Sequence, residues 1–250
     1  MNKTKAKPKP TSATEEVAEI VKTIFWALLI AFVIRTLLFQ PYTIPSASEE
    51  PNLYTGDYIV VSKWSYGYSR HSILFSPPIF KGRIFFTPPK RGDVIVFKLP
   101  RDGHTDYIKR LIGMPGDTVQ VRNRIVYING KPLPQTPAGT RITDDHGYAE
   151  NVQLLRETNP EGRSYLIQQH PAVQPADNTG VYHVPPHCYF MMGDNRENSD
   201  DSRFDPGVGP DDPNLGGCGW DSSVDLSDEP GVGFVPEDNL VGRARIVMLS

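Results

Sequence analysis

The first forty residues divide into a polar stretch and an apolar stretch. Residues 1–14 contain lysines among Pro, Thr and Ala and show no apolar periodicity, a composition typical of a disordered tail. The chain is then mostly apolar from Ile20 to Phe39, and about 20 such residues are enough to cross a bilayer. The pattern therefore predicts a basic tail over 1–18 and a transmembrane helix over 19–39.

The basic residues set the predicted orientation of this helix. Four lysines precede it, and no Lys or Arg follows Arg35 until Lys63. Because basic residues stay on the cytoplasmic side of a membrane, we expect a cytoplasmic tail and an extracytoplasmic domain over 40–250. Two alternatives remain open. One is a buried core helix, which the lysine asymmetry disfavours, and the other is a cleavable secretory signal ending near Ser46 and Ser48.

Beyond residue 40 the apolar positions follow the short period of β-strands. Residues 131–187 are rich in Pro, Gly, Asn and Asp, and predict a loop-rich subdomain; residues 205–233 predict a surface insertion. The fold class indicated is mainly β. Short β-branched runs behind turn residues predict strands at 57–62, 93–98, 106–113, 118–121, 124–128, 189–192 and 240–249.

Composition narrows the class of protein. The net charge of −3 offers no basic surface, so no nucleic-acid partner is expected. Cys188 and Cys218 fit no zinc or redox spacing, and the sequence leaves open whether they form one disulfide or stay as two thiols. The six histidines lie in loop-like sequence without paired metal-binding spacing. Neither a zinc site nor a Ser-His-Asp triad is therefore predicted.

Candidate chemistry begins with two serines just after the apolar segment, Ser46 and Ser48, which lie between prolines. A serine hydroxyl needs a base to become a nucleophile. Lys109 is a candidate base, because it lies inside an apolar strand on the same face as Tyr107. Burial there lowers the pKa of the amine. The alternative is an ordinary surface lysine on an edge strand.

A third segment, residues 193–203, is dense in charged and turn-forming residues directly after an apolar strand. It lacks the alternating acids and the closing Glu of an EF-hand calcium loop. An exposed loop with local turns and ion pairs is the simpler interpretation.

Taken together, these segments resemble the bacterial type I signal peptidases, which are membrane-anchored Ser–Lys proteases. The likeness covers residues 20–248, and it depends on several short motifs that occur in the family's order. These motifs are Ile44-Pro45-Ser46-x-Ser48, Gly56-Asp57, Arg91-Gly92-Asp93-Val94, Asp106-Tyr107-Ile108-Lys109-Arg110, Gly116-Asp117, Gly193-Asp194-Asn195-Arg196-x-Asn198-Ser199-x-Asp201-Ser202-Arg203, Phe234-Val235-Pro236 and Val241-Gly242-Arg243-Ala244.

The resemblance implies a role for each matching residue. Ser48 is the expected nucleophile and Lys109 its base, with the Ser48 N–H and the Ser46 hydroxyl as the oxyanion hole. Ser199 is expected to orient the Lys109 amine. The remaining roles are an ion pair that braces the loop, Asp201 and Arg203, and a substrate pocket for small side chains, Ile44, Ile108, Tyr107 and Glu49.

The implied protein is a coiled antiparallel β-sheet domain behind one transmembrane helix, in the inner (plasma) membrane. It cleaves signal peptides from exported precursors and needs no cofactor. One position departs from the family: Glu49 stands where Met is usual after the nucleophile, with milder changes at Ala47 and Asn52. Two alternatives therefore remain open, a specialised Ser–Lys protease of the conjugation-pilin type and a weakened homologue that binds precursors without cutting them.

Overall fold

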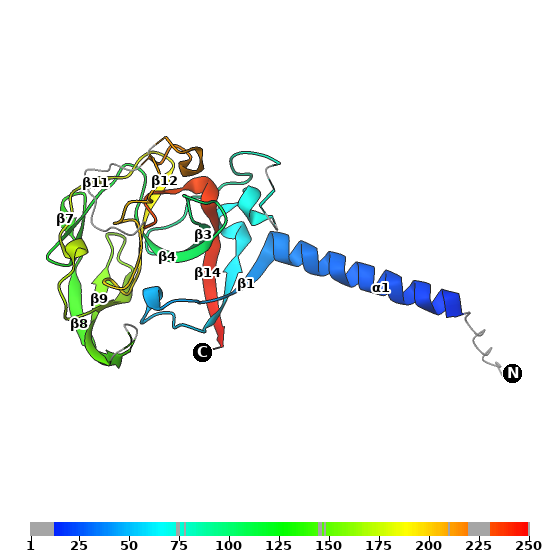
Figure 1. Cartoon of the computed structure of the whole chain (residues 1–250), viewed down its shortest axis with the longest axis horizontal. Coiled ribbons are helices and arrows are strands. Elements are labelled where there is room, and N and C mark those ends of the chain that lie inside the picture. Colours follow the sequence, from blue (N-terminus) through cyan, green and yellow to red (C-terminus); the bar gives the residue numbers. More distant parts are fainter. Residues whose placement is uncertain are drawn as a thin grey trace.

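The computed structural model describes residues 13–73, 76–77, 79–144, 147, 149–209, 211–219 and 231–249. Helix α1 (Ala13–Val33) projects away from a β domain (Figure 1) and continues as a five-residue π-helical turn, η1 (Ile34–Leu38). Together they are long and apolar enough to cross a membrane, and the span is not buried in the protein. The greater part of the predicted basic tail, residues 1–12, lies outside the described residues.

The helix is shifted toward the N-terminus relative to the predicted 19–39. Within the described residues it starts at Ala13, and its first turn holds Glu15 and Glu16, which are good helix formers at an end where negative charge is favourable. It ends before Phe39, which is already the first residue of a strand.

A seven-stranded sheet forms the centre of the β domain, and every neighbouring pair in it is antiparallel. Register shifts within β14 and in the β12–β4 pair mark bulges that bend the sheet. In spatial order the strands are β1 (Phe39–Thr43), β2 (Tyr58–Ser62), β14 (Leu240–Leu249), β3 (Val94–Lys98), β4 (Asp106–Gly113), β12 (Cys188–Met192) and β13 (Val235–Pro236).

Strand β12 joins two parts of the core, because it is buried on both faces. Phe190 and Met192 pack against a four-stranded sheet, whereas Tyr189 and Met191 pack against β3, β4 and β14. The segment 193–203 follows this fixed strand directly. The four-stranded sheet has the order β11 (Tyr182–His183), β5 (Thr118–Arg122), β6 (Ile125–Ile128) and β7 (Lys131–Pro132).

The region 131–187, predicted as a loop-rich subdomain, contains more strand than its composition indicates. It contains an antiparallel sheet of β8 (Gln135–Thr143), β9 (Glu150–Thr158) and β10 (Ser164–Gln169), at the end of the domain away from α1 (Figure 1). Strand β8 carries Pro, Gly and Thr and is largely exposed. It therefore lacks the alternation of apolar residues by which strands are detected in a sequence.

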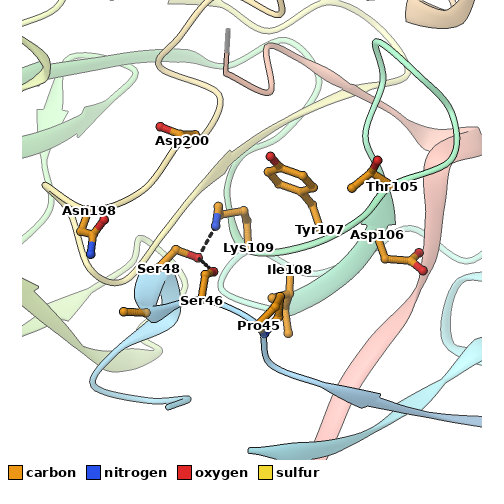
Figure 2. Close-up of a pocket in the computed structure, with 11 residues that line it drawn as sticks. Pro45, Ser46, Ser48, Thr105, Asp106, Tyr107, Ile108, Lys109, Asn198 and Asp200 are labelled. Carbon is orange, nitrogen blue, oxygen red and sulfur yellow. Dashed lines mark hydrogen bonds between the residues drawn. The ribbon is translucent and has the colours of Figure 1, made fainter. Parts of the chain in front are cut away.

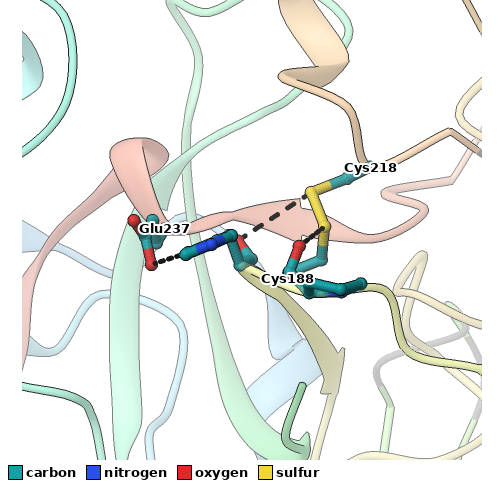
Figure 3. The surroundings of a disulfide bond; sticks show 5 residues. Cys188, Cys218 and Glu237 are labelled. Atoms are coloured by element: carbon teal, nitrogen blue, oxygen red, sulfur yellow. Dashed lines mark hydrogen bonds and ion pairs between the residues drawn. A yellow bond between two sulfur atoms is a disulfide. The ribbon is translucent and has the colours of Figure 1, made fainter. Parts of the chain in front are cut away.

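The predicted surface insertion 205–233 is partly built into the core. Leu215 and Cys218 are buried, and Cys218 forms a disulfide with Cys188 at the start of β12 (Figure 3). The structure thus decides the question of the cysteines that the sequence left open. The predicted fold class, mainly β with an antiparallel sheet and one N-terminal helix, is confirmed.

Candidate active site

Ser48 lies on a short 3₁₀ turn, Ala47–Glu49, just past the end of β1, and Ser46 is the extended residue directly before this turn. Hydrogen bonds fix the chain on both sides of this turn. Before it, Ile44 donates its N–H to the Asp57 carbonyl at 2.9 Å. Within it, the Ser48 carbonyl accepts the Asn195 backbone N–H at 3.1 Å. The Ser48 side chain is thereby held nearly buried, at 6% exposure.

Lys109 reaches this turn from strand β4, and its Nζ is hydrogen-bonded to the Ser48 Oγ (Figure 2). The Ser46 Oγ lies 3.3 Å from the Ser48 Oγ. Burial lowers the pKa of the Lys109 amine, although Glu49, Asp201, Asp200 and Asp194 act in the opposite direction. A lysine with a lowered pKa is more often neutral, so its lone pair can accept a proton.

Glu49 points inward from the same turn and is completely buried. Neither of its oxygens has a hydrogen-bond partner among the described residues; the Asp194 N–H lowers the carboxyl's pKa slightly without making a well-formed hydrogen bond. Burial, followed by the Asp194 carboxylate, raises the pKa of Glu49 well above its usual range, against the opposing charges of Lys109 and Arg110. Glu49 is therefore neutral at a pH where an ordinary glutamate is ionised.

The neighbour of Lys109 on β4, Arg110, points to the other face of the strand. Its guanidinium holds Asp194 with two hydrogen bonds, of 2.6 and 2.5 Å, and lies 4.2 Å from the centre of the Tyr165 ring. Asn52 donates to the same Asp194 at 2.7 Å. Asp194 is thus firmly paired although it lies near the Lys109 amine.

The loop 193–203 contributes a second ion pair. Arg203 binds both oxygens of Asp201, at 2.8 and 2.9 Å. Burial raises the pKa of Asp201, but the Arg203 charge and its hydrogen bonds outweigh burial and hold the pKa below its usual value. Ser199 donates to Asp201 at 3.0 Å, and within the described residues no hydrogen bond joins it to Lys109.

Two adjoining cavities open beside the serines. The larger, of about 310 Å³, is lined by Ser46, Ser48 and Lys109, and the smaller, of about 140 Å³, by Ile44. Tyr107 and Ile108 line both. Glu49, which was predicted as a pocket residue, lines neither of these cavities. The reason is that a 3₁₀ turn, rather than an extended strand, directs its side chain into the protein.

The sequence analysis assigned no role to two residues of the site, Asn195 and His170. Asn195 donates to the nucleophile turn, and His170, 1% exposed, contacts Asn195. His170 follows the short apolar run of β10, which is the signal that could have marked it as buried. Within the described part of the chain, no group of three His, Cys, Asp or Glu residues is arranged to hold a metal ion.

The structure thus defines a class: a mainly β protein with one helix able to span a membrane and a buried serine hydrogen-bonded to a buried lysine. Comparison with known proteins makes this specific. A model of the family "Signal peptidase, peptidase S26" matches residues 17–249, and the chain belongs to this family. It is an enzyme, a serine endopeptidase of the signal peptidase I type, and the predicted resemblance is confirmed.

Several curated relatives carry the name signal peptidase I. The one from Rickettsia typhi is 35% identical over 250 residues, covering 96% of this chain and 83% of the relative. The one from Rickettsia prowazekii is 37% identical over 235 residues, covering 90% and 77%. A crystallised signal peptidase I from Enterococcus faecalis is 25% identical and covers 63% of this chain and 97% of that chain, with a TM-score of 0.31. The family match and the two Rickettsia relatives do not favour the pilin-processing and non-cutting alternatives.

Proposed function

We propose that this enzyme removes signal peptides from exported precursors by acyl transfer through Ser48, with Lys109 as the general base. The observation that carries the proposal is the buried hydrogen bond between the Ser48 Oγ and the Lys109 Nζ at the wall of a cavity. Nucleophile and base within hydrogen-bonding reach are the geometric signature of covalent catalysis.

In the acylation step, neutral Lys109 takes the Ser48 proton as the Oγ attacks the scissile carbonyl carbon. The resulting tetrahedral intermediate collapses when the C–N bond breaks and Lys109 returns the proton to the departing amine. The signal peptide is left as an ester on Ser48. Water then attacks this ester, Lys109 takes a proton from the water, and the proton finally returns to the Ser48 oxygen as the acid product leaves.

The negative charge of the intermediate needs donors that are already in place. The Ser48 backbone N–H has no acceptor among the described residues, so it is available for the oxyanion. The Ser46 hydroxyl, 3.3 Å from the Ser48 Oγ, supplies a second donor on the same side. Asp201, Arg203 and Ser199 support the site from behind by holding the loop 193–203.

Substrate choice follows from the size of the cavities. Ile44 and Ile108 narrow the smaller cavity, of about 140 Å³, which suits alanine-like side chains. A bulky side chain that cannot enter is excluded by steric overlap, a stronger discrimination than the loss of a single contact. We therefore assign these cavities to the small residues that precede the cleavage site.

The enzyme works as a single-pass protein of the inner membrane, with its N-terminus in the cytoplasm. Lys3, Lys5, Lys7 and Lys9 on the N-terminal side support this orientation. The disulfide between Cys188 and Cys218 supports it independently, because disulfides persist in oxidising compartments outside the cytoplasm. The β domain begins at Phe39, next to the bilayer. A precursor can then keep its apolar segment in the lipid while its cleavage site reaches Ser48.

The proposal is tested with the full chain purified in detergent and a precursor that carries an Ala-x-Ala site. The wild type should release the mature protein, and Ser48→Ala should lose this activity while keeping its thermal unfolding temperature. As a matched control, Ser72→Ala changes a serine of the same domain that lies outside both cavities. Cleavage by Ser48→Ala at the wild-type rate would exclude the proposed nucleophile.

A further inference from the structure

We propose that His170 is a positioning residue for this reaction, because through Asn195 it holds the turn that carries Ser48. The inference rests on the proposed role of Ser48 as nucleophile. It assigns a task to the three-stranded sheet, which supplies His170 from the end of β10. No motif of the sequence pointed to this histidine.

The backbone first brings His170 to the catalytic loop. Strand β10 runs beside residues 194–196, with Gln168 donating its N–H to the Asp194 carbonyl at 2.9 Å. The Arg196 N–H donates back to the Gln168 carbonyl at 3.1 Å. This pairing is parallel, with Gln168 opposite Asn195. His170, two residues further along, therefore lies against the Asn195 side chain.

Asn195 in turn binds two carbonyls of the nucleophile turn, those of Ala47 and Ser48. Its backbone N–H donates to the Ser48 oxygen at 3.1 Å, and its Nδ2 donates to the Ala47 oxygen at 3.2 Å. Because the carbonyl of Ala47 can only accept, the amide nitrogen of Asn195 must face it. The amide oxygen then faces the opposite way, where the His170 Nε2 lies 3.0 Å from it.

His170 itself is held rigidly enough to fix that amide. Its Nδ1 lies 2.5 Å from a Glu150 carboxylate oxygen, and its backbone N–H donates to Glu197 at 2.9 Å. The Gln168 Nε2 approaches the same Nε2 at 3.3 Å. Because the Asn195 amide oxygen that faces Nε2 can only accept, Nε2 supplies the proton of this hydrogen bond. The Nε2–H is thus the donor that fixes the Asn195 amide.

This arrangement bears on the rate of the chemical step. Without the Nε2–H, the Asn195 amide can rotate by half a turn and present its oxygen to the Ala47 carbonyl. The turn then loses a hydrogen bond, and the Ser48 N–H loses its fixed direction. A misdirected oxyanion donor lowers kcat. Neither His170 nor Asn195 lines the two cavities, so substrate binding should change little.

A buried histidine also stabilises a fold, and the experiment must separate that role from positioning. His170→Leu removes both ring donors at similar size, His170→Gln keeps one amide donor, and Asn195→Ala removes the intermediary. The matched control is His183→Leu, on the exposed end of β11. All variants are made in the full chain and assayed on one precursor, with thermal unfolding measured alongside.

We expect His170→Leu to lower kcat about tenfold or more, the scale of a weakened oxyanion donor, with KM changed less than about twofold. His170→Gln should recover most of the loss. In the Asn195→Ala background, His170→Leu should lower kcat almost no further, because His170 acts through Asn195. Glu150→Gln should lower kcat about threefold, since it weakens the contact with Nδ1 that orients the His170 ring toward Asn195.

The inference is overturned if folded His170→Leu has the wild-type kcat. It is also overturned if His170→Leu lowers kcat by the same factor in the Asn195→Ala background as in the wild type. If His170→Leu fails to fold, a wild-type kcat in Glu150→Gln overturns it instead. Ser48→Ala in the same assay keeps the two proposals apart. Activity in Ser48→Ala removes the proposed function, whereas an inactive Ser48→Ala beside fully active His170 variants removes only the positioning role.

Discussion

Two lysines of this protein, Lys63 and Lys109, are buried to a similar extent but differ in whether they can act as a general base. Lys63 is 2% exposed, and burial lowers its pKa to about 8. Lys109 is 3% exposed, and burial lowers its pKa as well. The Lys63 amine, however, donates to the Ser72 carbonyl at 2.6 Å, which has no proton to give, whereas the Lys109 amine meets the Ser48 hydroxyl beside a cavity. Desolvation keeps a lysine neutral more often, but the group that its amine contacts decides whether it can act as a general base.

The second difference lies in the charges near each amine. Three buried carboxyl groups act on Lys109, and each has its charge reduced. Asp194 is bound to Arg110, and Asp201 is bound to Arg203. Glu49 has a raised pKa and is neutral over a wider pH range. The ion pairs of the catalytic loop thus protect a neutral lysine that would otherwise be held protonated.

The difference between the two lysines is tested most strongly by removing each amine in turn. Lys109→Met should lower kcat/KM by about 10³-fold or more, because general-base catalysis contributes about 10²–10⁴-fold. Lys63→Met should stay within about threefold of wild type, since the amine donates to a backbone carbonyl and lines neither cavity. Steady-state cleavage of one precursor by folded variants measures both effects. Equal losses for the two variants would show that Lys109 acts through stability rather than chemistry.

The effect of the ion pairs on Lys109 is tested by removing the cation that neutralises Asp201. Arg203→Met leaves a buried carboxylate without its cation, and breaking such a pair costs about 3–5 kcal/mol of stability. The freed charge should raise the pKa of Lys109. Each unit of such a shift lowers the neutral amine about tenfold well below its pKa. The pH profile of kcat/KM should therefore move to higher pH, and Arg203→Lys should restore part of the effect.

An unchanged pH profile in a folded Arg203→Met enzyme would contradict the shielding role of this ion pair. The unfolding free energy, measured in urea on the same samples, separates the loss of stability from the shift of the profile.

A smaller effect is expected at Glu49. When its carboxyl ionises, the charge raises the pKa of Lys109, so Glu49→Met should move the rise of activity to lower pH. Glu49→Gln removes the charge but keeps a buried polar amide, and should give part of the same shift. Because the raised pKa already keeps Glu49 largely neutral, we expect a gain of about tenfold or less near neutral pH. Superimposable profiles for the three proteins would show that Glu49 does not act on Lys109.

The sequence predicted the central strands well, because β2, β3 and β4 carry apolar β-branched residues behind turn signals. It placed Lys109 on the same face as Tyr107, and the amine lies 5.8 Å from the centre of that ring. The exposed strand β8 gave no such pattern and was missed.

Contacts between distant segments were the least accessible to sequence reasoning. In an extended chain the Glu49 side chain would point away from Lys109, whereas the 3₁₀ turn buries it near Lys109. His170 was set aside with the other histidines because it lies in loop-like sequence, and the sequence did not show that it contacts Asn195, 25 residues away in the chain. Local patterns show which face of an element is buried, but not which other element packs against it.

The central claim, a neutral Lys109 beside Ser48, is tested most directly by titrating its side chain. Nuclear magnetic resonance of the full chain in detergent micelles, with lysine labelled by carbon-13 next to the amine, follows each lysine as pH changes. Lys109→Arg and Lys63→Arg assign the two signals. Lys109 should titrate below the ordinary lysine value of 10.5, and Lys63 near 8. A Lys109 midpoint at or above 10.5, with Lys63 still lowered, would contradict the account.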